Sequence, residues 1–168
     1  MHAKDVLIEA YGRIQEEVRT VVDGLSPDDL NARPGDRTNS ITWLVWHLTR
    51  VQDDHIADAF GLKQVWLSAG WADRFALALP RTDTGYGHTS QKVAKVRVDS
   101  GDLLVGYYDA VHEQTLRALR DLRADDLDRV VDDNWSPPVT LSVRLVSVLS
   151  DDLQHVGQAA YARGLLGA

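Results

Sequence analysis

The chain has 168 residues, 44% of them hydrophobic, and a formal charge of −7 at pH 7. This length and composition predict one globular domain, residues 1–168, with a sizeable core. The sequence contains no cysteine, so disulfides, a cysteine-ligated zinc site and a thiol nucleophile from the protein itself are excluded. Lysine and arginine are scattered rather than gathered in a stripe, which argues against nucleic acid as a partner.

Hydropathy argues against a membrane partner. The longest apolar run falls far short of the roughly 20 residues that cross a bilayer. The N-terminal segment MHAKDVLIEAYGR lacks the apolar core of a secretion signal. We therefore expect a cytoplasmic protein.

The first predicted helix covers residues 3–23. Its apolar residues recur every three or four positions with Glu and Arg between them, as in an amphipathic helix: Val6, Leu7, Ala10, Ile14, Val18, Val21 and Val22. Gly24 ends this helix. Ser26 followed by Pro27 then begins a short helical turn that reaches Asn31.

A second helix is predicted over residues 41–60, with Ser40 as its N-cap. Its buried stripe is formed by apolar residues at helical spacing: Ile41, Leu44, Val45, Leu48 and Val51. His47 lies next to that stripe. Asp54 and His55, seven and eight residues further on, return to the same side of the helix.

Residues 62–90 have a weaker pattern, a short helical piece followed by a loop rich in Gly, Thr and Asp. Long loops inside compact domains are usually functional lids or binding loops. We therefore predict that this segment covers a site and contacts the substrate through four side chains: Trp66, Trp71, Tyr86 and His88. The alternative is that these aromatic side chains only pack the loop onto the helices.

The second half of the chain predicts two more long helices. A short helix over residues 90–98 precedes a long one over residues 101–122, and residues 124–131 are predicted as one more helical turn. The prolines in residues 134–138 forbid helix before the last one. Without strand alternation or repeats, the pattern predicts an all-α fold, an up-and-down four-helix bundle with a long connection between helices two and three.

The last helix, residues 140–164, carries an acid pair and a histidine inside an otherwise apolar pattern. Asp151 and His155 are four residues apart, so both side chains reach one ion or one proton. Asp152, three residues before His155, is the competing carboxylate. A buried carboxylate costs several kcal/mol unless it is paired or binds a metal, so its charge needs compensation.

A histidine on a half-buried helix is more often a satisfied core residue than a ligand. Two such histidines together favour a metal site, because helical bundles build these sites from side chains that project inward from facing helices. His47, Asp151 and His155 offer two nitrogens and one oxygen, a three-ligand set with open positions that suits catalysis. Residues 53–55 stay an alternative set of ligands or a solvated helix end, and His112 is expected at the surface.

With His47 in the segment WLVWHLTRVQ and with Asp151-x-x-x-His155-x-Gly-Gln in the last helix, the chain resembles the DinB-like four-helix metalloprotein superfamily. This superfamily includes the mycothiol and bacillithiol S-transferases, and the likeness covers essentially the whole chain. The resemblance implies that His47, Asp151 and His155 bind a divalent metal, with Asp151 standing where a histidine is usual. We expect zinc, with nickel or iron as alternatives, because a mixed nitrogen and oxygen site is not very selective.

The resemblance also implies a metal-dependent thiol S-transferase, in which the metal lowers the pKa of a bound low-molecular-weight thiol such as mycothiol. The thiolate then attacks a small electrophilic substrate, which fits a chain that has no cysteine of its own. The alternative is a non-catalytic metal-binding bundle or a metal-dependent hydrolase. No catalytic residue beyond the metal ligands is assigned, and a homodimer is kept open as the assembly.

Overall fold

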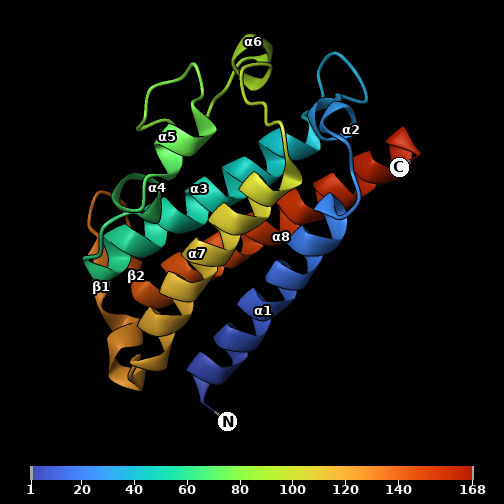
Figure 1. Ribbon diagram of the computed structural model, residues 1–168. Coiled ribbons are helices and arrows are strands. Elements are labelled where there is room, and N and C mark those ends of the chain that lie inside the picture. Colours follow the sequence, from blue (N-terminus) through green and yellow to red (C-terminus); the bar gives the residue numbers. More distant parts are fainter. Residues whose placement is uncertain (1, 168) are drawn as a thin grey trace.

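The structure, a computed structural model, describes residues 2–167. Four long helices dominate this part of the chain: α1 (Ala3–Val22), α3 (Ile41–Phe60), α7 (Gly101–Arg120) and α8 (Leu141–Leu166). They pack in the order α1, α7, α3, α8 around one core (Figure 1). The fold is therefore all-α, as predicted from the sequence.

The ends of the long helices follow from capping chemistry. The Ser40 hydroxyl accepts a hydrogen bond from the Trp43 amide, and Gly61 ends α3 in the left-handed conformation with φ of 65°. The Thr140 hydroxyl likewise accepts from the Val143 amide at the start of α8. Both ends predicted for α3 are confirmed.

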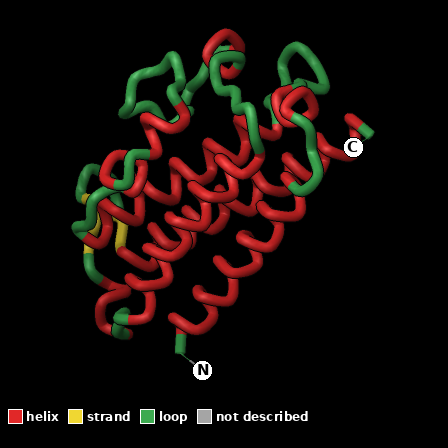
Figure 2. The backbone as a smooth tube through the Cα atoms, viewed as in Figure 1, coloured by secondary structure: helices red, strands yellow, loops and turns green. Residues whose placement is uncertain are grey.

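Shorter elements connect the long helices: α2 (Pro27–Asn31), α4 (Val65–Ser68), α5 (Trp71–Phe75), α6 (Ser90–Val93), the 3₁₀ helix η1 (Ala124–Asp128), and the strands β1 (Val130–Asp132) and β2 (Val139–Thr140). The strands form a small antiparallel pair (Figure 2). Sequence patterning missed this pair because strands of three and two residues are too short to show alternation. The helical turn predicted over residues 124–131 therefore ends early, where β1 begins.

The helix predicted over residues 90–98 ends at Val93, and its N-cap is Thr89. A turn at residues 94–95 follows, and the chain does not return to helix because another side chain takes the backbone hydrogen bonds of Val98. The Asn31 amide donates to the Val98 carbonyl at 2.7 Å, and its oxygen accepts from the Val98 amide at 3.0 Å. Asn31 is distant in sequence, so local periodicity gives no sign of this contact.

Residues 62–90 lie along the outer side of α3 (Figure 1). A buried carboxylate fixes the start of this segment, because Asp53 accepts hydrogen bonds from the Val65 amide at 2.8 Å and the Trp66 amide at 2.7 Å. The same carboxylate accepts from the Tyr107 hydroxyl and lies 3.7 Å from the fully buried Arg50 guanidinium. The 62–90 segment covers the outer side of α3, and α7 and α8 pack against its inner side. Residues 41–50 are therefore all buried.

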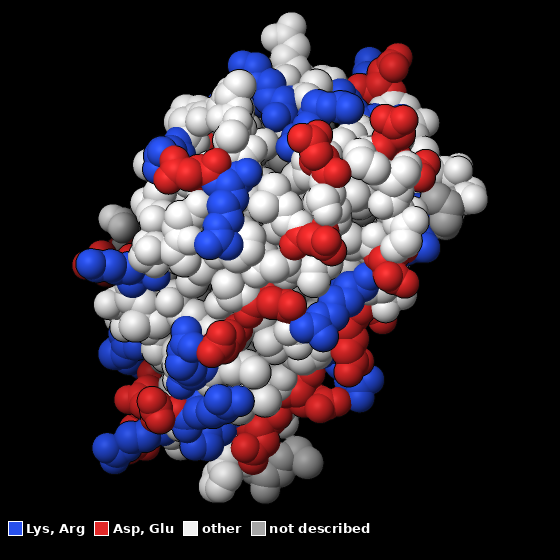
Figure 3. All heavy atoms as spheres, in the orientation of Figure 1, with Lys and Arg blue, Asp and Glu red and all other residues white. Residues whose placement is uncertain are grey.

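The surface carries no basic stripe on the face that Figure 3 shows, where lysine and arginine alternate with aspartate and glutamate. This agrees with the scattered cations of the sequence. No helix within residues 2–167 has both the length and the hydropathy of a membrane span.

Candidate metal centre

His47 lies in the buried middle of α3, with 5% of its surface exposed. The Trp43 ring, one turn earlier, stacks on the His47 imidazole with 4.5 Å between ring centroids. Burial lowers the pKa of His47, although the Thr84 carbonyl opposes this shift. The lowered pKa favours a neutral imidazole, which is the form that binds metals.

Asp151 and His155 face His47 from α8. The Nε2 atom of His155 lies 3.6 Å from Oδ1 of Asp151, and the His47 and His155 ring centroids are 4.8 Å apart. One ligand atom from each of the three residues lies within 4.8 Å of the other two. Small side-chain rotations close this separation to metal–ligand bonds of roughly 2 Å. The three side chains predicted as ligands are thus brought together.

Both imidazoles are oriented by carbonyl oxygens. His47 Nδ1 lies 2.5 Å from the Thr84 backbone oxygen, and His155 Nδ1 lies 2.8 Å from the Gln158 side-chain oxygen. Since a carbonyl oxygen only accepts, each Nδ1 carries the proton and each Nε2 keeps a free lone pair. Metal-binding histidines in proteins are usually held in this way.

Asp151 completes a donor set that fits a divalent metal. Its Oδ2 atom is buried and has no hydrogen-bond partner in the protein. An orphaned carboxylate oxygen beside two free imidazole nitrogens is the chemistry that a divalent cation satisfies. His47, Asp151 and His155 form the only such group of three or more ligands found within residues 2–167.

Asp152, the competing carboxylate, lies outside this group. It is fully buried and neither oxygen has a hydrogen-bond partner. Burial, and in addition the Asp151 carboxylate, raises the pKa of Asp152 well above its usual range. The raised pKa favours the neutral form of this carboxyl group, and Asp151 is the carboxylate available to a cation.

The second alternative, residues 53–55, is engaged elsewhere. Asp53 anchors the start of the 62–90 segment, and Asp54 accepts from the Gln64 amide at 2.6 Å. His55 Nδ1 lies 2.6 Å from an Arg144 nitrogen, so it accepts from the guanidinium. These partners leave no cluster of free ligands at this end of α3.

A loop, residues 83–88, closes over His47, and we call it the 83–88 loop. It supplies the Thr84 carbonyl, and Gly85 comes so close that an added Cβ would lie 2.6 Å from His47 Nδ1. Asp83 fixes the loop by accepting from the Gly85 amide at 3.1 Å and pairing with His88 Nε2 at 2.8 Å. Its backbone oxygen also accepts from Arg50 at 3.3 Å.

The four side chains predicted to contact substrate have different surroundings. Trp66 and Trp71 are buried, and both rings pack against Tyr107. The His88 side chain is 1% exposed, accepts from the Trp43 indole at 3.1 Å and pairs with Asp83. Tyr86 is 92% exposed. The structure therefore gives three of them a packing role, while their contact with a substrate stays a prediction.

The sequence did not reveal the residues that orient the ligands. Thr84 contributes only a backbone atom, 37 positions from His47, which no sequence pattern records. Gly85, in the segment Thr-Gly-Tyr-Gly, has φ of 95°. The presence of glycine at this position was the available signal for a positive φ angle. Gln158, three residues after His155, shares its side of the helix and was the most detectable of the three.

Two hollows are lined by a chain neighbour or a hydrogen-bond partner of a ligand, and none of the three ligands lines either hollow. One of about 240 Å³ is lined by Trp46, the neighbour of His47, and by Trp66, with residues 72–81 around it. Another of about 270 Å³ lies between Leu44 and Gln158, the residue that holds His155.

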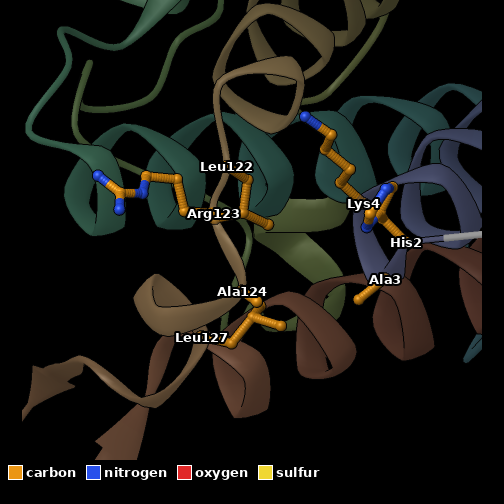
Figure 4. A pocket seen from close by; sticks show the side chains of 7 residues that line it. All are labelled: His2, Ala3, Lys4, Leu122, Arg123, Ala124 and Leu127. Carbon is orange, nitrogen blue, oxygen red and sulfur yellow. The ribbon is translucent and has the colours of Figure 1, made fainter.

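A third cavity, of about 330 Å³, lies at the start of α1 and shares no residue with the centre (Figure 4). The Lys4 ammonium donates to the Arg120 carbonyl at 2.8 Å. The Arg123 side chain points away from Lys4 (Figure 4). The lining of this third cavity contains no carboxylate, so the cavity offers no set of metal ligands comparable to the centre.

Fold and centre together define a helical protein in which facing helices present two histidines and one aspartate to a common space. Residues 7–168 match the family model described as mycothiol-S-transferase, and the chain therefore belongs to this family. The solved structure of a conserved protein from Enterococcus faecalis is similar, with 35% identity and a TM-score of 0.93 over 99% of this chain and 98% of that one. A search of curated proteins finds no match. The resemblance stated from the sequence is confirmed.

Proposed function

We propose that the chain is a metal-dependent thiol S-transferase, which conjugates a low-molecular-weight thiol such as mycothiol to a small electrophile. The observation that carries this proposal is the convergence of His47, Asp151 and His155 in a cysteine-free member of the mycothiol S-transferase family. Zinc is the favoured ion, with nickel and iron as alternatives. We further infer an up-and-down order of the four long helices in one domain and a cytoplasmic location.

A divalent ion held there supplies Lewis acidity, which lowers the pKa of a thiol that binds to it. The protein's own contribution is orientation. Thr84 and Gln158 fix the two imidazole rings so that each Nε2 faces the common space. The stacked Trp43 ring and the 83–88 loop exclude water around His47, which strengthens electrostatic interactions at the centre.

For the electrophile we propose the hollow beside Trp46, which Trp66 lines. An aromatic wall binds the apolar parts of a small molecule, and Trp46 in this wall directly precedes His47 in the chain. Tyr86 lies in the same 62–90 segment, and its side chain is exposed and does not pack against the helices. We therefore retain Tyr86 as a substrate contact.

The test combines metal analysis with a thiol conjugation assay on protein purified without a metal-affinity tag. Monochlorobimane serves as the electrophile, and mycothiol, bacillithiol and glutathione serve as thiols. We expect one metal ion per chain and a rate above the uncatalysed reaction with at least one thiol. Both are lost on chelation, and the rate returns when zinc is restored.

Two other results would change the assignment. If the protein binds its metal but accelerates conjugation with none of the thiols, a metal-binding bundle or hydrolase becomes the better description. If conjugation persists after the metal has been removed, the three-residue centre is not the site of reaction.

A further inference from the structure

The solvent-facing side of α8 has no charged side chain. The four charged residues of this helix are Arg144, Asp151, Asp152 and Arg163, and all are buried or half-buried. In the chain as a whole, 26% of the residues are charged. We call the exposed side of α8 the outer face; an uncharged surface along a 26-residue helix is unusual for a helix that faces water only.

Large apolar side chains occupy this outer face. Val143, Val146, Leu153, Tyr161 and Leu165 are each more than half exposed. They account for five of the eleven large hydrophobic residues that are exposed in the described part of the chain. Clustered exposed hydrophobic residues mark interaction sites, whereas single ones need no explanation.

The centre of the outer face has the spacing of a helix-pairing seam. Exposed uncharged residues recur at alternating steps of three and four: Val143, Val146, Ser150, Leu153, Gly157, Ala160 and Gly164. This alternation keeps a single line of side chains facing a partner helix. The large residues of the line, two valines and Leu153, lie in its first half, and the second half contains only glycine and alanine.

The glycines in the second half have no role in packing the chain on itself. An added Cβ at Gly157 or Gly164 would meet no atom within 4 Å. Glycine inside a helix lowers helix stability. Two glycines that no contact within the chain requires indicate that another molecule packs closely against this part of α8.

We propose that the outer face of α8 packs antiparallel against the same face of a second copy of this chain. With the twofold axis near Leu153, Val143 lies opposite Gly164, and Val146 lies opposite Ala160. Ser150 then lies opposite Gly157. The two valines each meet a small residue and Leu153 meets its own copy at the axis, so the contact is self-complementary, as a twofold interface requires.

Charge also favours a second copy as the occupant. Two chains that each carry −7 repel one another, and this repulsion is weakest across a face without charged side chains. A strongly charged partner would find nothing complementary there. A twofold contact needs no charge complementarity, because shape alone matches the two halves of the seam.

The first test is the mass of the full chain in solution by light scattering across a concentration series. We expect the wild type to be a dimer and Leu153→Glu to be monomeric at the same concentration, because two carboxylates would meet at the axis. Leu67→Glu, at a similarly exposed leucine on α4, is the matched control and stays dimeric. Gly164→Met, which clashes with nothing inside one chain, keeps the helical circular dichroism and raises the dissociation constant at least tenfold.

The second test uses the cysteine-free sequence, in which any introduced cysteine is the only one. Under mild oxidation Leu153→Cys crosslinks to itself. Val143→Cys and Gly164→Cys do not crosslink alone but crosslink when mixed, since a disulfide needs Cα atoms within roughly 7 Å. A monomeric wild type, a dimer that survives Leu153→Glu, a dimer broken by Leu67→Glu, or self-crosslinking of Val143→Cys would each overturn the proposal.

Discussion

Asp151 and Asp152 are neighbours in the chain with opposite surroundings. Asp151 is half-buried, faces two imidazoles and has one oxygen without a partner. Asp152 is turned into the core, where burial raises its pKa and favours its neutral form. A helix places consecutive residues about 100° apart, so one side chain reaches the centre and the next does not.

This difference predicts the outcome of two isosteric substitutions. We expect Asp151→Asn to lower metal affinity at least tenfold, because a neutral amide is a poor cation ligand. Asp152→Asn should retain stoichiometric metal, since it replaces a carboxyl group that is already neutral. Elemental analysis after dialysis, followed by a zinc titration, measures both. The reverse pattern would show that the wrong carboxylate has been assigned.

Gly85 gives a second prediction for single residues. In Gly85→Ala the methyl group would lie 2.6 Å from His47 Nδ1, so the ring or the loop must move. We expect metal affinity to fall about 10- to 100-fold, the usual effect of disturbing a group that orients a ligand. Gly87→Ala is the control, because Gly87 also has positive φ but open space around it. Equal losses in both variants would indicate backbone strain alone.

His112 gives a pH-dependent prediction and a correction, because it is 5% exposed and not a surface residue. Burial lowers the pKa of His112, so the folded protein keeps it neutral while the unfolded chain takes up a proton below about pH 6.5. The stability that His112 contributes is present above that pH and is lost as the pH falls toward the lowered pKa.

The substitution His112→Phe tests this, since phenylalanine preserves the stacking on Tyr108 and cannot titrate. We expect the urea midpoint of the metal-free variant to fall less than that of the wild type between pH 7.5 and 5.5. One proton accounts for at most about 1.4 kcal/mol per pH unit. His47 and His55 also have lowered pKa values, so some acid sensitivity remains. An unchanged slope would contradict this account.

Among the elements, the 62–90 segment depends on α3 through a buried ion pair. Asp53 and Arg50 are both fully buried, and Asp53 holds the amides that begin α4. Asp53→Ala would leave the guanidinium without its anion and cost about 3–5 kcal/mol. We also expect faster hydrogen exchange at Val65 and Trp66. Asp54→Ala, at the neighbouring half-buried carboxylate, should cost less than half as much in the same urea titration.

The long helices were predictable because their signals are local. Ser40 and Gly61 bound α3 as the sequence predicts, since an N-cap and a left-handed glycine act within one turn. The early end of α6 was not predictable, because Asn31, far away in the chain, takes the backbone hydrogen bonds of Val98. The all-α class is confirmed, while the up-and-down order of the helices stays a prediction.

The candidate centre also has residues that were predictable from the sequence and residues that were not. Asp151 and His155 were predictable as a pair from helical spacing, and His47 from its place beside the buried stripe of a facing helix. The Thr84 carbonyl was not, because a loop brings it to His47 across 37 positions. Trp66 and Trp71 were predicted as substrate contacts from loop length alone, which says nothing about the Tyr107 ring beneath them.

For the molecule as a whole, the core is large compared with the metal centre. Buried residues from all four long helices form one cluster, whereas the candidate centre found within residues 2–167 consists of His47, Asp151 and His155. We therefore expect the metal-free protein to keep its helical circular dichroism. Metal at 100 times its dissociation constant adds about 2.7 kcal/mol, which raises Tm by roughly 5–10 °C. Unfolding on chelation would instead mean that the centre is structural.

The 83–88 loop also has a consequence for exchange kinetics. Its carbonyl holds the Nδ1 proton of His47, and its backbone blocks the approach to that ring. Turning the His47 ring away from the common space would therefore require the loop to lift, which breaks the contacts of Asp83 with His88, Lys92 and Arg50. We therefore expect substitution of Asp83 to shorten the residence time of a bound ion, because the ring is then free to turn, more than it changes the equilibrium affinity.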